Sequence, residues 1–320
     1  MARPMARPMT GRDDADHSRL WLDDGRHLAF AEGGAPDGFP VFYFHGTPSS
    51  RLEAGFADAA ARRSGFRLIA PDRPGYGRSD FQQDRQLQSW PRDVLALAEH
   101  LRIGAFGIAG HSGGGPYLLA CGAAIDPARL RFIAALAPWG PVASPDIMAS
   151  LNRLDRAFAR LANRVPGILR LGFAPMGWAA RHQPKLFMGL LRHAVSAPDQ
   201  EVLAQGSVAR RFMAMEAEAF RQGSRGATQD ACLAYRDWGF DIAANRVPIQ
   251  MWLGDADLFV SRAMGDHLAR AVPRMTAYWM EGAGHLCFER WDAIFARCRA
   301  EISARGAQIG GSRRPPSQEP

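Results

Sequence analysis

The sequence predicts an α/β fold, with a mostly parallel, doubly wound sheet of about eight strands and one helical insertion. Two observations predict it. Short apolar runs alternate with helical runs along most of the chain, as at 66–70 and 92–101. Strands that are apolar throughout are buried on both faces, as in parallel sheets covered by helices. Between about 140 and 240 the alternation stops and only helical patterns remain.

The first expected strands form a hairpin, because the runs "RLWLD" and "RHLAFAE" flank the turn signal "DDG". Further strands are expected where short apolar runs end in turn residues, at 40–44, 66–70, 105–110, 130–138, 249–254 and 275–280. Helical runs lie between them, at 53–63, 92–101, 115–125, 262–272 and 291–302. Ser89 precedes the second of these helices and Pro91 lies near its first turn, so we expect the Ser89 hydroxyl to cap it.

The chain divides into a core and an insertion. We expect an α/β core over 18–139 and 241–303, interrupted by a helical cap or lid over 140–240. The insertion could also be no more than an extra structural layer, and a membrane-surface helix is the least favoured alternative because the polar faces are broken. The ends carry a repeated "MARPM" and a tail rich in Gly and Pro, so we expect disorder over 1–17 and 304–320.

Composition argues against several classes of protein. The chain has 320 residues, 47% hydrophobic and 22% charged, as in ordinary globular proteins. Its net charge is +7, but only one of the 39 basic residues is lysine and no nucleic-acid motif accompanies them, so we expect no nucleic-acid partner. No apolar run reaches the roughly 18 residues of a membrane span, so we expect no membrane partner. The cysteines form no C-x-x-C pair, so we expect no metal, no cofactor and reduced thiols in the cytoplasm.

A serine follows the expected strand at 105–110. It is Ser112, in a G-x-S-x-G motif with Gly110 and Gly114, and a helical run comes next. On a sharp strand-to-helix turn, this motif strains the serine backbone and presents the hydroxyl at the carboxyl edge of the sheet. Phosphate loops and plain turns share the glycines, but the order of strand, motif and helix predicts Ser112 as a nucleophile.

A serine hydroxyl needs a base, and the base needs an orienting carboxylate. His285 follows the last expected strand, in a loop at the same edge of the sheet as Ser112. Asp255 and Asp257 follow the strand at 249–254, and both can reach that edge. The chain order of nucleophile, acid and base differs from that of chymotrypsin and of subtilisin. We therefore predict a catalytic triad of Ser112, His285 and one of these aspartates.

Four stretches of the chain resemble the α/β-hydrolase superfamily, over roughly residues 18–303. They are "FHGTP", "DRPGYGRSD", "GHSGGG" with "GDADLFV", and "GAGHL". The resemblance implies the α/β-hydrolase fold, a serine nucleophile and an acid in a G-x-x-D pattern. Gly254 and Asp257 fit that pattern, which favours Asp257 over Asp255. Some members place the acid after the preceding strand, where the nearest aspartate, Asp146, is poorly placed.

The resemblance also gives a role to the loop after the strand at 40–44. Acyl transfer creates an oxyanion that needs preset N–H donors. In the family one donor follows the nucleophile, here Gly113, and another comes from this loop. Gly46 permits an unusual backbone direction, so that the Thr47 N–H can point inward, and His45 is expected to brace the loop. We predict an oxyanion hole formed by the backbone of Thr47 and Gly113, supported by His45 and Gly46.

These residues favour a carboxylesterase-like hydrolase that cleaves an ester, thioester or lactone. Similar haloalkane dehalogenases and epoxide hydrolases attack with aspartate, which Ser112 disfavours. Proline-specific aminopeptidases use cap glutamates that Glu216 and Glu218 could imitate, although we expect both on an exposed helical face. An aminopeptidase or amidase stays open as an alternative, as does a ligand-binding receptor with little turnover. We expect a small hydrophobic acyl substrate, and a homodimer also stays open.

Overall fold

The core of the protein is a single sheet of eight strands. The structure is a computed structural model that describes residues 18–151 and 153–311. The strand order is β1-β2-β4-β3-β5-β6-β7-β8; the pairs β1–β2 and β2–β4 are antiparallel and the others are parallel. The predicted mostly parallel sheet is confirmed. The strands are β1 (Ser18–Trp21), β2 (His27–Gly34), β3 (Phe39–Phe44), β4 (Phe66–Pro71), β5 (Phe106–His111), β6 (Leu130–Leu136), β7 (Ile249–Gly254) and β8 (Met275–Met280).

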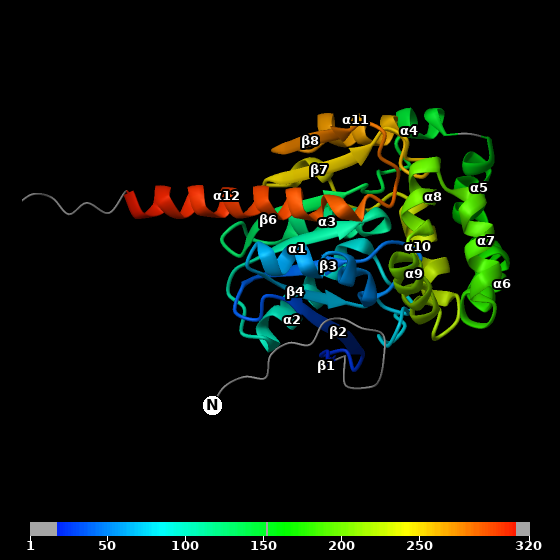
Figure 1. Cartoon of the computed structure of the whole chain (residues 1–320), viewed down its shortest axis with the longest axis horizontal. Helices are drawn as coiled ribbons and strands as arrows, with labels where there is room; N and C mark the ends of the chain where they lie inside the picture. The colour runs from blue at the N-terminus through cyan, green and yellow to red at the C-terminus, as the bar shows by residue number, and fades with distance from the viewer. Residues whose placement is uncertain (1–17, 152, 312–320) are drawn as a thin grey trace, which may run out of the picture.

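Helices cover both faces of this sheet (Figure 1). One hydrophobic core packs α1 and α12 against the sheet, and a second packs α2, α3 and α11 against the other face. The central strands are therefore buried on both sides, which explains why their sequences are mostly apolar. These helices are α1 (Asp58–Arg63), α2 (Trp90–His100), α3 (Gly115–Ala124), α11 (Arg262–Ala271) and α12 (Trp291–Gly311).

The segment between β6 and β7 is helical in the part that the structure describes. Figure 1 shows these helices beyond the ends of the strands to which the arrows point, with α5, α6 and α7 farthest from the sheet. The carboxyl ends of parallel strands are where ligands bind in open α/β folds, so this segment lies over the expected site. Its helices are α4 (Pro145–Ser150), α5 (Arg153–Arg164), α6 (Leu169–His182), α7 (Pro184–Ala194), α8 (Ala197–Ala204), α9 (Gly206–Ala219) and α10 (Arg225–Tyr235).

Three local expectations differ from the structure. The Ser89 hydroxyl donates to the Gln86 carbonyl at 2.6 Å and does not cap α2, because the backbone of Ser89 is itself helical. The helix expected at 53–63 is a 3-10 helix, η1 (Arg51–Phe56), followed by α1. The last helix continues to Gly311, past the expected end of the core at residue 303. The expected disorder over 1–17 and 312–320 lies outside the described residues, and residues 304–311, also expected to be disordered, continue α12.

None of the helices within 18–151 and 153–311 combines the length and the apolar character needed to cross a bilayer.

Candidate active site

Ser112 lies on a strained turn at the carboxyl end of β5. Its φ angle is 50°, in the left-handed region that side chains disfavour. The flanking glycines are required here, because a Cβ on Gly110 or Gly114 would lie 2.6 Å from the Phe44 carbonyl oxygen of the neighbouring strand. The G-x-S-x-G spacing thus lets β5 run close to β3 and turn directly into the helix that follows Ser112.

His285 and Asp257 form a buried pair. The His285 Nδ1 lies 2.7 Å from the Asp257 Oδ2, and the two side chains are 7% and 0% exposed. The other carboxylate oxygen of Asp257 accepts the backbone N–H groups of Phe259 (2.7 Å) and Val260 (2.9 Å). An ionised carboxylate only accepts hydrogen bonds, so Nδ1 carries the proton and Nε2 is the nitrogen free to act as a base.

The other two candidate acids lie elsewhere. Asp255 accepts the Gly282 N–H at 2.8 Å on the exposed side of the same turn. Asp146 is half exposed on α4 and pairs with His267 of α11 at 2.8 Å. Of the aspartates considered from the sequence, Asp257 is therefore the one in contact with His285.

The turn at Ser112 and the loop of His285 are tied together. The preceding residue, His111, donates from Nε2 to the His285 carbonyl at 3.0 Å, and the two rings are 4.7 Å apart. The Ser112 carbonyl in turn accepts the Trp139 N–H at 2.9 Å. The fold thus brings positions 112 and 285 into adjacent segments although they are distant in sequence.

The charges around His285 favour its protonated form. Burial by itself lowers the pKa of His285, but the carboxylate of Asp257, followed by those of Asp199 and Glu53, raises it above the ordinary value of 6.5. Burial raises the pKa of Asp257, and the bond to His285 together with two backbone N–H groups lowers it below its ordinary range. An imidazole with this environment is a stronger base than free histidine.

The loop after β3 packs against the turn at Ser112. A Cβ on Gly113 would overlap the Thr47 hydroxyl and lie 3.0 Å from the Thr47 nitrogen, so the two expected oxyanion donors are neighbours. The buried Glu53 carboxylate accepts the Gly46 N–H at 3.1 Å. The His45 Nε2 accepts the Arg73 N–H at 3.1 Å, which leaves Nδ1 to donate to the Gly46 carbonyl at 2.8 Å.

His45 is held as a neutral brace. Burial and the nearby Arg73 lower the pKa of His45 to about 4. Burial by itself raises the pKa of Glu53, but contacts with His111 and Ser49 lower it to about 2. The loop is therefore fixed by a neutral imidazole on one side and a carboxylate on the other.

A buried ionic cluster that the sequence did not reveal connects this loop to the helical segment. Asp230 of α10 accepts hydrogen bonds from Arg73 (2.9 Å), Arg85, Tyr117 (2.6 Å) and the Thr47 hydroxyl (3.0 Å). Burial raises the pKa of Asp230, but the charges of the two arginines lower it below the ordinary range. No spacing along the chain joins these residues, which are brought together by tertiary contacts alone.

Arg73 also holds the carbonyl groups of the same loop. Its guanidinium donates to the carbonyl of His45, to that of Gly46 at 2.7 Å and to the Thr47 hydroxyl at 2.8 Å. Arg73 is completely buried, and the Asp230 charge raises its pKa although burial lowers it. Arg73 fixes the direction of two successive peptide groups, and this sets where the Thr47 N–H points.

A second residue, whose role was not predicted from the sequence, supports the His285 loop. Asp199 of α8 accepts the backbone N–H groups of His285 (3.0 Å) and Leu286 (2.7 Å) and the Ser196 hydroxyl (2.7 Å). A Cβ on Gly284 would overlap the same carboxylate, so the loop backbone lies directly against it. The S-x-x-D spacing of Ser196 and Asp199 is typical of a helix N-terminus. This pattern predicts only a local role for Asp199 and does not indicate its contact with the His285 loop.

Glu216 and Glu218 are not on an exposed face, contrary to our expectation. Glu218 is mostly buried and pairs with Arg51 at 2.7 Å. Glu216 is 3% exposed, and its Oε2 has no hydrogen-bond partner in the described part of the chain. Burial and then the nearby Glu53 raise the pKa of Glu216 well above its ordinary value. A carboxyl group held neutral does not favour a cationic amine, which weakens the aminopeptidase alternative.

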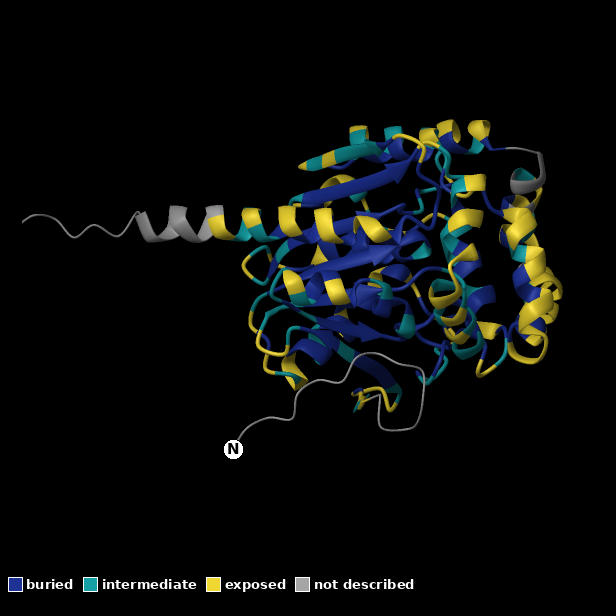
Figure 2. Cartoon of the chain, in the orientation of Figure 1, coloured by how far each residue is buried: buried dark blue, intermediate teal, exposed yellow. Residues whose placement is uncertain are grey.

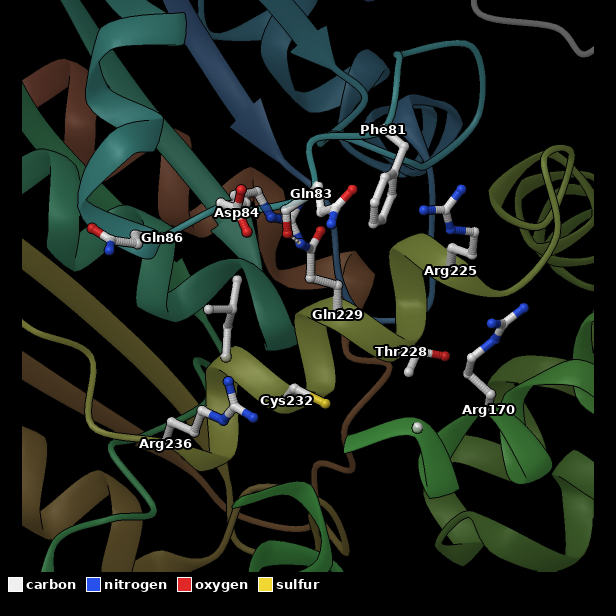
Figure 3. A pocket seen from close by; sticks show the side chains of 13 residues that line it. Phe81, Gln83, Asp84, Gln86, Arg170, Arg225, Thr228, Gln229, Cys232 and Arg236 are labelled. Carbon is white, nitrogen blue, oxygen red and sulfur yellow. Dashed lines mark hydrogen bonds between the residues drawn. The ribbon is translucent and has the colours of Figure 1, made fainter. Parts of the chain in front are cut away.

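An open pocket lies between the 81–86 loop and α10, away from Ser112. Figure 3 shows its lining side chains, including Arg170, Arg225 and Arg236, and its volume is about 510 Å³. Ser112 and His285 do not line it and are 9% and 5% exposed. The candidate catalytic residues are therefore covered rather than placed in this pocket.

The fold and this site define an α/β protein in which a strained serine follows a histidine bonded to the loop of a buried histidine–aspartate pair. The chain matches the alpha/beta hydrolase family over residues 41–297 and belongs to that family. This stretch includes the loop after β3, the turn at Ser112 and the loop of His285.

Several known proteins are similar to this chain. The non-heme chloroperoxidase of Streptomyces lividans is 29% identical over 177 residues, which cover 53% of this chain and 64% of that protein. The bifunctional esterase/perhydrolase DCH of Acinetobacter calcoaceticus is 32% identical over 93 residues, which cover 29% of this chain and 34% of that protein. The alignments thus span less than two thirds of these relatives.

Solved structures agree in fold. That of the esterase RhEst1 from Rhodococcus sp. ECU1013 has a TM-score of 0.65 at 18% identity and covers 90% of this chain and 98% of its own. At this identity, the likeness establishes the fold and not the reaction.

Proposed function

We propose that this protein is a serine hydrolase that cleaves a carboxylic ester, thioester or lactone through an acyl-enzyme on Ser112. The observation that supports the proposal best is the 2.7 Å contact between His285 and Asp257, in a loop bonded to the residue before Ser112. A strained serine, a buried imidazole with a raised pKa and a carboxylate on Nδ1 are the components that acyl transfer requires.

In the proposed first half-reaction, the Ser112 hydroxyl attacks the carbonyl carbon of the substrate. The His285 Nε2 takes the hydroxyl proton, and the Asp257 carboxylate stabilises the imidazolium that results. The N–H groups of Gly113 and Thr47 bind the oxyanion of the tetrahedral intermediate. When the intermediate collapses, the carbon–oxygen or carbon–sulfur bond breaks, and His285 returns the proton to the leaving group.

In the second half-reaction, water replaces the alcohol. The His285 Nε2 takes a proton from the water, the resulting hydroxide attacks the acyl carbon, and the proton then returns to Ser112 Oγ. The products are a carboxylic acid and free enzyme.

The similar proteins support an acyl substrate. One relative is named an esterase/perhydrolase. A serine at position 112 disfavours the alkyl–enzyme route of related folds that attack with aspartate. The free and buried cysteines suit a reducing compartment, which supports the cytoplasm; they are Cys121, Cys232, Cys287 and Cys298.

Turnover of p-nitrophenyl acetate and butyrate tests the proposal. We expect multiple turnovers by the wild type, covalent labelling by a fluorophosphonate, and loss of both in Ser112→Ala. A single burst equal to the enzyme concentration would instead indicate a receptor that acylates once. If Ser112→Ala hydrolyses these esters as fast as the wild type, the proposed mechanism is wrong.

A further inference from the structure

The positive charge of this protein is concentrated in one stretch of the helical segment. Residues 156–195 contain seven basic residues and no Asp or Glu. The whole chain has 39 basic and 32 acidic residues, so the remainder has 39 − 7 = 32 of each and no net charge. The entire formal charge of +7 therefore belongs to these forty residues. The seven are Arg156, Arg160, Arg164, Arg170, Arg181, Lys185 and Arg192.

The same stretch exposes large apolar side chains. On α6, Leu171 is 74% and Trp178 is 53% exposed; on α7, Leu186 is 52% and Leu190 is 62% exposed. Residues seven or four apart lie on one side of a helix, so each pair forms a stripe. The two helices pack against each other, and Figure 2 shows their outer surface as mostly exposed, on the side away from the sheet.

Basic side chains accompany these stripes. Arg170 and Arg181 on α6, and Lys185 and Arg192 on α7, are all exposed; Arg170 also lines the pocket beside α10, and Arg181 donates to the Arg221 carbonyl at 3.4 Å. We call these four, together with the four apolar residues above, the α6–α7 face. A solvated helix face normally carries charges of both signs and few large apolar groups, so this face differs from an ordinary surface.

Charge decides which partner this face fits. Two copies of the chain that met through this face would bring together two surfaces that each carry four basic side chains and no acidic one, which opposes a symmetric dimer. A surface that combines exposed Leu and Trp with Lys and Arg matches a bilayer interface, where apolar groups enter between the lipids and cations meet anionic headgroups. Nucleic acid would satisfy the basic residues and leave the Leu and Trp side chains without partners.

We propose that the α6–α7 face docks on the surface of an anionic phospholipid bilayer, with α6 and α7 lying in its plane. Trp178 and the three leucines enter the interface, and the basic side chains contact the headgroups. This departs from the expectation of no membrane partner, which was based on the absence of a span. The breaks that argued against a surface helix lie at the 3-10 helix Pro166–Ile168 and at Gln183, before α7, and they separate short helices without removing the shared face.

Co-sedimentation of the full chain with vesicles tests this proposal. We compare vesicles of phosphatidylcholine alone with vesicles of equal parts phosphatidylcholine and phosphatidylglycerol. We expect at least tenfold stronger binding to the anionic vesicles, weakening as salt is added. The tryptophan fluorescence of the protein should shift to shorter wavelength on binding, because the Trp178 indole leaves water.

Two double variants separate the components of binding. Arg181→Gln with Lys185→Gln should weaken binding about fivefold for each charge removed. Trp178→Ala with Leu190→Ser should reduce binding to the anionic vesicles at least tenfold. Trp21→Ala, which alters a tryptophan 67% exposed on β1, and Arg270→Gln, an exposed arginine on α11, should bind like the wild type.

Several outcomes would overturn the proposal. They are equal binding to neutral and anionic vesicles, no binding to either, or unchanged binding by both double variants. A dimer in solution that the Trp178 and Leu190 changes dissociate would assign the face to a second copy, and tighter binding to duplex DNA than to vesicles would assign it to nucleic acid. Ser112→Ala should bind vesicles like the wild type, so the test is independent of the proposed hydrolase activity.

Discussion

Asp199 accepts the backbone N–H of His285 at 3.0 Å and that of Leu286 at 2.7 Å. The carboxylate comes from α8, between β6 and β7, and the histidine from the loop after β8. The helical segment therefore does more than cover the site, because one of its side chains fixes the loop that carries the candidate base.

Replacing Asp199 with asparagine should alter the titration of His285. The groups around this imidazole are Asp257, Asp199 and Glu53, and all three raise its pKa. Without the Asp199 charge, the pKa of His285 falls, so the acid limb of kcat/KM against pH should move to lower pH. The buried N–H groups also lose an acceptor, and stability should fall by about 1–3 kcal/mol.

The matched control is Glu201→Gln, an exposed change on the same helix. It should leave both the pH profile and the urea midpoint unchanged. An Asp199→Asn variant that is less stable but keeps the wild-type acid limb of kcat/KM would show that Asp199 has a structural role only.

Asp257→Asn should remove most of the activity. The variant loses the carboxylate that holds His285 in its reactive tautomer, and we expect kcat to fall by roughly a thousandfold or more. The residual activity should have an acid limb at lower pH, because Asp257 is the main group that raises the pKa of His285. Asp255→Asn, a change on the same turn, is the control and should retain most of the activity.

The Arg73 guanidinium should control catalysis through the Thr47 loop. Lysine keeps the positive charge beside Asp230. It lacks the planar set of N–H donors with which the guanidinium binds the His45 and Gly46 carbonyls together. We expect Arg73→Lys to lower kcat between about tenfold and a hundredfold with a smaller change in KM, since a misplaced donor costs less than a missing one.

Arg85→Lys provides the comparison. Arg85 pairs with the same Asp230 and donates to the Pro74 carbonyl at 3.0 Å, and among the described residues it has no hydrogen bond to the Thr47 loop. If both variants lose stability and kcat to the same extent, Arg73 stabilises the ionic cluster around Asp230 and does not specifically orient the Thr47 N–H.

Glu216 should make the protein less stable as the pH rises. Its folded pKa lies well above the unfolded value of 4.5, so the folded state binds more protons between these two values. The free energy of unfolding therefore decreases with rising pH in that window. Glu216→Gln removes this dependence and should be increasingly more stable than the wild type from pH 4.5 to pH 7.

Urea unfolding at both ends of that range measures the effect, and Glu289→Gln, a change of a largely exposed carboxylate, is the control. A stability difference between Glu216→Gln and the wild type that stays constant over this range would mean that Glu216 is ionised when folded.

Much of the fold could be predicted from local sequence. The run 249–254 coincides with β7, which is buried at every position, and the run 275–280 coincides with the half-buried edge strand β8, because short apolar runs that end in turn residues favour strands. The turn at Ser112 could also be predicted from local sequence, since the close approach of β3 requires glycine at positions 110 and 114.

The supporting residues could not be predicted in this way. Asp199, Asp230 and Arg73 act on segments up to 183 positions away, and their own neighbourhoods look like an ordinary helix start, a helix interior and a loop. The sequence alone determined the alternation of elements, the strained serine and the order of the candidate triad, because these depend on neighbouring residues. Only the tertiary structure decided which aspartate meets His285, which side chains hold the two loops and where Glu216 is buried, because those contacts depend on how distant segments pack.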